Sequence, residues 1–189
     1  DPLICAGCGA CSAVCPSGAI SYDAPSSDFV FRRINTLAST YRVAGGKDAV
    51  LLVHDDHGAE MIGLCARYGR GLPAHVIPME VEALAGFGHA EMVGALASGF
   101  ARVDILLAPK TERDALVPQA ALANAIAPEK IDLLDIADPD ALADHLYAQT
   151  PLTAIKSPIL PLGTRRQVAR LSAKVLNPDA STLPLPENA

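Results

Sequence analysis

Short apolar runs alternate with longer segments in which apolar residues recur every three or four positions, and this pattern fills the middle of the chain. The runs cover residues 49–53, 75–79, 103–108 and 131–136. Each is apolar almost throughout, which is typical of a parallel strand covered on both faces. Strands that alternate with helices over short connections favour right-handed crossovers. The pattern therefore predicts an α/β fold, an open parallel sheet of about four strands with helices on both faces.

Helices are expected between and around these runs. A stripe of Met61, Leu64, Cys65 and Tyr68 predicts a helix in which Cys65 is a buried residue and not a ligand. Thr111 and Asp114 suit a capping box, but we expect Pro118 to interrupt the chain there, so that a turn precedes a helix over about 118–126. The other expected helices cover about 31–44, 89–96, 139–147 and 164–176, the third opened by Asp138 and the last with Val168, Leu171 and Val175 inward.

The 189 residues divide, on this interpretation, into four parts. Residues 1–24 form a cysteine-rich segment, and 25–46 form a linker and a helix, with Pro25 in a linker over 21–28. The α/β domain follows over 47–148, and 149–189 is a C-terminal extension with one helix.

The composition argues against a nucleic-acid-binding protein and against a membrane span. A net charge of -6, no tryptophan and 4% aromatic residues give no footprint for nucleic acid. No apolar stretch approaches the roughly 20 residues of a spanning helix, so we expect a soluble, cytoplasmic protein with no membrane span.

The clearest chemical signal is near the N-terminus. Cys5, Cys8, Cys11 and Cys15, followed by Pro16, have the spacing C-x2-C-x2-C-x3-C-P. This spacing holds a [4Fe-4S] cluster, because thiolates two residues apart can wrap a short loop around it. The spacers Ala6, Gly7, Gly9, Ala10, Ser12 and Ala13 are small, and Gly7 and Gly9 can take up positive φ.

The segment from Cys5 to Ile20 resembles one half of a bacterial two-cluster ferredoxin. The resemblance implies that Cys5, Cys8 and Cys11 ligate one cluster, while Cys15 reaches to a second. The motif occurs once, and the chain begins with Asp1-Pro2. We therefore expect a piece of a longer polypeptide whose other ferredoxin half lies outside it.

Two other uses of these thiols compete with a cluster. Zinc would take the same ligands, but zinc sites usually pair C-x2-C knuckles across a longer gap. A disulfide framework suits short secreted domains, whereas half of these residues are hydrophobic, enough for an ordinary core.

Residues 47–127 resemble the delta-subunit family of methyl-viologen-reducing hydrogenases, small iron-sulfur electron carriers that also occur fused to ferredoxin domains. The likeness rests on the strand and polar turn at His54 to Gly58, on the strand end at Ile77-Pro78, and on Ala101 to Pro109. It implies a flavodoxin-like fold. Family members have cysteines at those strand ends, but here His54 and His57 stand in place of a C-x2-C pair, so no cluster ligand is carried over.

Polar side chains nevertheless gather where the predicted strands end. His54 and His57, with nearby carboxylates, form an alternative divalent-metal site, although solvation alone also collects polar residues on such loops. A nucleotide site is not indicated, because Gly69-Arg70-Gly71 and Gly86-Phe87-Gly88 are too short for a dinucleotide fingerprint.

The sequence therefore predicts an electron-transfer module with a [4Fe-4S] cluster, part of a larger multi-cluster redox protein. It fits an electron carrier or an oxidoreductase subunit better than a stand-alone enzyme. Its expected partners are a redox protein or other domains of the parent chain. The competing hypothesis is a docking module that joins ferredoxin domains without a functional cluster of its own. The last helix is basic, which reflects either a solvated face or a surface for an acidic electron donor.

Overall fold

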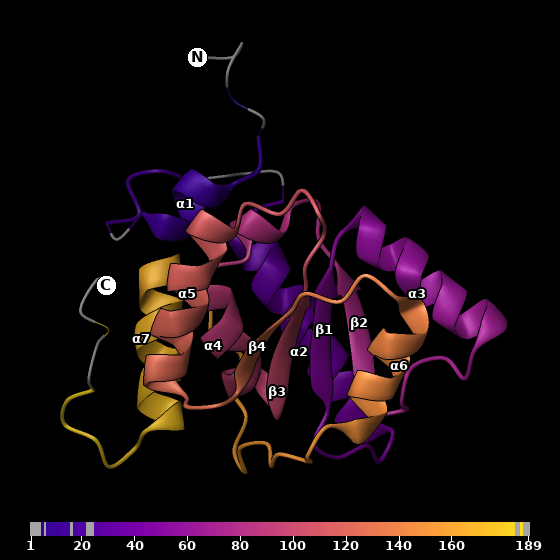
Figure 1. The fold of residues 1–189 in the computed structure, drawn as a ribbon. Coiled ribbons are helices and arrows are strands. Elements are labelled where there is room, and N and C mark those ends of the chain that lie inside the picture. The colour runs from indigo at the N-terminus through magenta and orange to yellow at the C-terminus, as the bar shows by residue number, and fades with distance from the viewer. Residues whose placement is uncertain (1–4, 6, 16, 22–24, 184–185, 187–189) are drawn as a thin grey trace.

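The computed structural model describes residues 5, 7–15, 17–21, 25–183 and 186. Within these residues it has one parallel sheet of four strands in the order β2-β1-β3-β4. The strands are β1 (Val50–His54), β2 (Val76–Glu80), β3 (Arg102–Leu106) and β4 (Ile131–Leu134) (Figure 1). The order is that of the first four strands of a flavodoxin-like sheet. The predicted fold class is thus confirmed.

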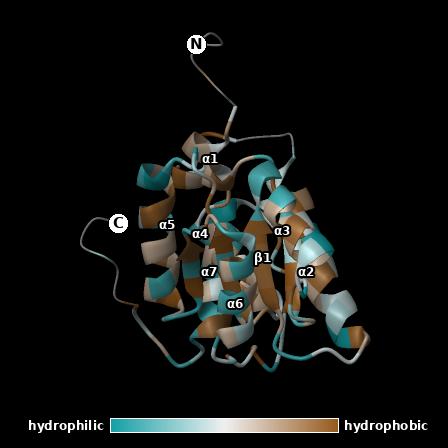
Figure 2. Ribbon diagram, turned by 45° about the vertical axis from the view of Figure 1, so that its right-hand side comes forward, coloured by the Kyte–Doolittle hydropathy of each residue, from teal (hydrophilic) through white to brown (hydrophobic). Residues whose placement is uncertain are grey.

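Helices cover both faces of the sheet (Figures 1 and 2). One face carries α3 (Asp56–Tyr68) and α6 (Pro139–Ala148), and the other carries α2 (Ser27–Val43), α4 (His89–Ser98), α5 (Arg113–Ile126) and α7 (Arg165–Leu176). Strand β1 contributes side chains to the apolar clusters on both faces of the sheet, because successive side chains of a strand point to opposite faces. Leu51 and Val53 join the larger apolar cluster, and Val50 and Leu52 join the smaller one.

Helix α4 is the centre of the larger layer. It packs against the sheet, α2, α5 and α7, and every residue from Ala90 to Ser98 is buried. The close packing depends on Gly94, where a Cβ would lie 3.2 Å from the ring of Phe31 and 3.3 Å from Val168. Because Phe31 lies on α2 and Val168 on α7, these two helices are part of the core of the α/β fold.

Helix starts follow the local capping chemistry. The N-cap of α6 is Asp138, whose carboxylate accepts a hydrogen bond from Ala141 N at 2.8 Å, as predicted. Helix α2 begins earlier than predicted, because the Ser26 hydroxyl caps it by accepting from Phe29 N at 3.4 Å. The linker expected over 21–28 is therefore wrong from Ser27 onward, while residues 22–24 lie outside the described part.

The predicted break at Pro118 is also wrong. Helix α5 runs through Pro118 without interruption. The proline lies close to the start of the helix, so it removes one hydrogen bond to the first turn, and the buried side chains of Leu116 and Ala120 hold the segment against the core. The capping box is not formed. The Thr111 hydroxyl instead accepts a hydrogen bond from Ala108 N at 2.8 Å, in the turn before the helix.

Two predicted stripes are narrower than expected. On α3, Met61 and Cys65 are buried and join the smaller apolar cluster, but Leu64 and Tyr68 are exposed. On α7, Leu171 is exposed. Val168 and Ser172, one turn apart, are buried instead, and Val168 lies against Gly94 of α4. No helix in the described residues has the length and apolarity to cross a membrane.

Candidate iron-sulfur segment

The cysteine segment forms a tight loop followed by a single short helix, α1 (Ala10–Val14). Gly7 and Gly9 have φ of 70° and 78°, the left-handed conformation that the small spacers predicted. The carbonyl of Gly9 then accepts hydrogen bonds from Ser12 N and Ala13 N at 3.0 and 3.1 Å, which turns the chain into the helix that carries Cys11. Ala6 and Pro16 of the motif lie outside the described residues.

This segment sits over the carboxyl end of the sheet (Figure 1). Helix α1 packs against α5 and against the 3-10 helix η1 (Leu84–Gly86), which follow β3 and β2 respectively. Two glycines allow the approach. A Cβ at Gly86 would lie 3.0 Å from the carbonyl oxygen of Cys8, and one at Gly88 would lie 3.1 Å from the Cβ of Ala13. The cysteine segment is therefore docked backbone to backbone on the α/β fold.

Arg165 fastens this contact. Its guanidinium donates to the Glu91 carboxylate at 2.5 Å, to the Ser12 hydroxyl, and to the Gly86 carbonyl at 3.5 Å. Glu91 is 1% exposed, and its second oxygen accepts from Gly88 N at 3.0 Å. Burial raises the pKa of Glu91, and the charge of Arg165 opposes that shift. One side chain from α7 thus joins α1, η1 and α4.

Sequence reasoning missed this role of Arg165, which it grouped with the solvated basic residues of the last helix. Glu91 stands three residues after Gly88, at the N3 position of α4, where an acidic residue commonly bonds back to the helix start. That spacing was a usable signal for Glu91. The partnership with Arg165 spans 74 residues and was not visible in any local pattern.

The thiols of the segment are unpaired. Cys5 and Cys11 are exposed, Cys8 and Cys15 are partly exposed, and none of the four forms a disulfide. The Sγ of Cys8 lies 4.0 Å from the Glu112 carboxylate. The Sγ of Cys15 lies 3.5 Å from the Ser17 hydroxyl. That hydroxyl, helped by the backbone N–H of Ile20, lowers the pKa of Cys15 to about 7, so a large share of it is thiolate at neutral pH.

Within the described residues no three His, Cys, Asp or Glu side chains gather as ligands of one metal ion would. A cubane cluster makes a different demand, because each of its irons takes its own thiolate. A set of unpaired thiols on a short loop, with small spacers and glycines at positive φ, suits that demand. The donor chemistry of the segment therefore fits a [4Fe-4S] cluster.

The alternative site at the end of β1 gains no further ligand. His54 is buried, and its Nδ1 lies 2.9 Å from the carbonyl of Asp55. His57 lies in the first turn of α3 and is partly exposed. Among the described residues no third ligand joins these two histidines. A metal at His54 and His57 stays a prediction.

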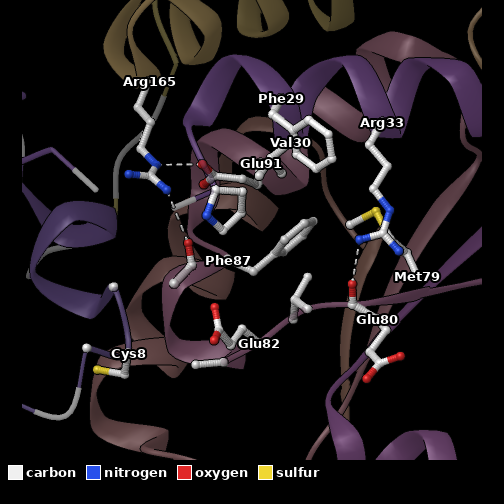
Figure 3. Close-up of a pocket in the computed structure, with 16 residues that line it drawn as sticks. Cys8, Phe29, Val30, Arg33, Met79, Glu80, Glu82, Phe87, Glu91 and Arg165 are labelled. Carbon is white, nitrogen blue, oxygen red and sulfur yellow. Dashed lines mark hydrogen bonds and ion pairs between the residues drawn. The ribbon is translucent and has the colours of Figure 1, made fainter. Parts of the chain in front are cut away.

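A pocket of about 260 Å³ opens beside the cysteine loop (Figure 3). Cys8 and Arg33 lie at opposite ends of it, with the ring of Phe87 between them. Arg33 donates a hydrogen bond to the Glu80 carbonyl at 2.8 Å, which ties α2 to the end of β2. The pocket is thus framed by the cysteine loop, by α2 and by the segment after β2.

Residues 1–21 match the family model of the 4Fe-4S binding domain. No curated protein and no solved structure matches the chain. The class of the N-terminal segment is therefore defined: it is a ferredoxin-type segment that binds a [4Fe-4S] cluster and transfers electrons. The match ends before α2, so the likeness of residues 47–127 to the hydrogenase delta-subunit family stays a prediction.

Proposed function

We propose that this chain is one electron-transfer module of a larger multi-cluster redox protein, in which Cys5, Cys8 and Cys11 ligate a [4Fe-4S] cluster and Cys15 reaches toward a second one. The observation that carries the proposal is the unpaired thiol set within the segment that matches the 4Fe-4S binding domain. When bound, such a cluster supplies a one-electron centre whose potential lies within about -700 to +450 mV.

The residues around the thiols have distinct tasks in this proposal. Gly7 and Gly9 give the loop its tight path, and the contacts of Gly86 and Arg165 hold the segment against η1 and α7. The Glu112 carboxylate beside Cys8 disfavours additional negative charge nearby, and so it works toward a lower reduction potential. The α/β fold therefore fixes the position of the cysteine loop and also contributes to the electrostatics around it.

Anaerobic reconstitution with iron and sulfide tests the ligand assignment. The chain is expected to bind both elements, and Cys5→Ala, Cys8→Ala or Cys11→Ala is expected to abolish binding. Cys65→Ala is the matched control, because Cys65 is a buried cysteine on α3 and should leave the iron content unchanged. Stoichiometric zinc without sulfide, or full iron in the Cys8→Ala protein, would contradict the proposal.

The role of Cys15 needs a second experiment. A ferredoxin half depends on the last cysteine of its partner, so the isolated chain should hold its cluster weakly. A chain extended by a second cysteine motif should hold more iron per molecule. In the extended chain Cys15→Ala should lower the iron content, and equal iron in all three proteins would refute the half-site argument.

A relay and a docking module also differ in a measurable way. An electron relay must be reduced and reoxidised by a partner, whereas a docking module need only bind one. Identifying the donor or acceptor in the parent protein, and following cluster reduction by absorbance, separates the two.

A further inference from the structure

A second groove, of about 370 Å³, runs between α5 and α7 and ends at the cysteine segment. Figure 1 shows these two helices side by side below α1. The groove has an apolar floor and a basic rim. The floor is formed by Ala13, Leu122, Ile126, Ala169, Ala173 and Leu183. The rim is formed by His89, Arg165, Arg166 and Arg170, and Cys15 lies at its end.

Apart from Arg165, which pairs with Glu91, the arginines of the rim have no acidic partner among the described residues. Arg166, Arg170 and Lys174 are exposed and recur every four residues along α7. None of the three forms an ion pair with any residue that the structure describes. This positive stripe stands on a chain whose net charge is -6. The concentration of unpaired cations at one face calls for an acidic counterpart from outside.

The apolar floor sets this face apart from an ordinary solvated helix. Docking sites between proteins combine a buried apolar centre with a polar or charged rim. Small side chains, Ala169 and Ala173, leave room between α5 and α7 for side chains of another molecule. Complementary charge at such a rim accelerates encounter and fixes orientation.

We propose that the α5–α7 groove docks an acidic redox protein that exchanges electrons with the cluster held by the cysteine segment. Carboxylates of that protein would face Arg166, Arg170 and Lys174, and an apolar side chain would lie on the floor. Because Ala13 and Cys15 line the end of the groove, a protein docked there would lie against the cysteine segment that holds the cluster. This inference rests on the proposed function, because it identifies the partner of the same cluster.

Small charged oxidants test the electrostatic part. The reduced, cluster-loaded chain is mixed in a stopped-flow instrument with ferricyanide or with hexaammineruthenium(III), each of which accepts one electron. Arg166→Glu/Arg170→Glu should slow oxidation by the anionic reagent about tenfold at low salt and accelerate oxidation by the cationic one. The matched control is Lys47→Glu/Arg67→Glu, which changes the net charge equally at exposed positions before β1 and on α3. It should change either rate much less.

A protein probe tests docking itself. Electron exchange with an acidic two-cluster ferredoxin should be slowed about tenfold by Arg166→Glu/Arg170→Glu and should weaken with added salt. Ala169→Gln fills the groove without changing its charge. It should slow exchange with the ferredoxin and leave both small oxidants unaffected, while an unchanged thermal transition shows that the fold is intact.

The outcomes separate this inference from the proposed function. A chain that binds no cluster has no cluster absorbance to change when an oxidant is added, and the proposed function then fails. A cluster-loaded chain whose rates are equal in the groove variant and in the control overturns the inference alone. The same holds if the groove variant loses binding to a single-stranded DNA oligonucleotide and keeps its rate with the ferredoxin, because the face would then serve a nucleic acid.

Discussion

Replacing Arg165 by alanine is the sharpest test of how the cysteine segment is joined to the α/β fold. The change removes a guanidinium that is 20% exposed and leaves the Glu91 carboxylate, at 1% exposure, without its cation. It also removes the donor to the Ser12 hydroxyl on α1. The perturbation therefore combines a buried unpaired charge with the loss of a contact between two elements.

The magnitude follows from burial. Removing one partner of a buried ion pair costs about 3–5 kcal/mol, because the remaining charge has lost both water and its counterion. Two features place the Arg165–Glu91 pair at the lower end of this range of energies. Arg165 keeps some contact with solvent, and Glu91 can take up a proton instead of remaining charged. We expect Arg165→Ala to lower the free energy of unfolding by about 3 kcal/mol at neutral pH.

The pH dependence gives a second, independent signature. Burial raises the pKa of Glu91 above its ordinary value, so the native state binds the proton more tightly than the unfolded state. The stability linked to this group is therefore present at low pH and is lost as the pH rises through the raised pKa. Without Arg165 the pKa rises further, and the deficit of Arg165→Ala should be smaller in acid than at neutral pH. Glu91→Gln should remove this part of the pH dependence.

Urea unfolding followed by circular dichroism, across a range of pH, measures these effects. Arg165→Lys should recover part of the loss, and the double variant Arg165→Ala/Glu91→Gln should be more stable than the sum of its single changes implies. Arg166→Ala, one residue away and exposed, is the control and should change stability by less than about 0.5 kcal/mol. A loss at Arg165 no larger than that at Arg166, or one independent of pH, would refute the reasoning.

Three further predictions concern the rest of the fold. Removing residues 1–24 should leave a cooperative unfolding transition close to that of the whole chain, because neither cluster of buried apolar residues includes a described residue of that segment. A molten product would show that the segment is part of the core. Gly63→Ala should raise the melting temperature, because helix propensity favours alanine by about 0.5–1 kcal/mol and its Cβ would meet open space. Gly99→Ala should lower the melting temperature, because the residue has a φ of 108° and its Cβ would clash with Arg42. With the other cysteines changed to serine, Cys65 should react with a thiol reagent only when the protein unfolds. Burial raises the pKa of Cys65, and its Sγ donates a hydrogen bond to the Pro139 carbonyl at 3.0 Å. Rapid labelling of the native protein would contradict this prediction.

The strands could be read from the sequence because each run is buried on both faces, so apolarity alone marks it. Val50 to Val53 is buried throughout and lies where the pattern predicts. The ends of the helices and the faces that they bury were harder to predict from the sequence. Leu171 looks like a core residue by hydropathy, but it is exposed, and the neighbouring Ser172 is buried in its stead. Which side of a helix is buried depends on neighbours that periodicity does not reveal.

The sequence predicted only those parts of the site whose residues lie close together along the chain. The cysteine spacing and the glycines at positive φ belong to one short segment, so the sequence identified them directly. The support of that segment is not local. Gly86 and Gly88 were noted as too short a pattern for a nucleotide, whereas their role is to let the cysteine loop and α1 approach. Arg165 reaches its partners from the last helix, and only the fold brings them together.

The place of the cysteine segment has a consequence for the α/β fold itself. Open parallel sheets bind their ligands outside the carboxyl ends of the strands. Here α1 packs against η1 and α5, which start from that edge after β2 and β3. The edge is thus partly occupied by a segment from the N-terminus of the same chain. On the proposed function, the redox centre is held on thiols supplied by α1 and its flanking loops, beside the edge at which β2 and β3 end.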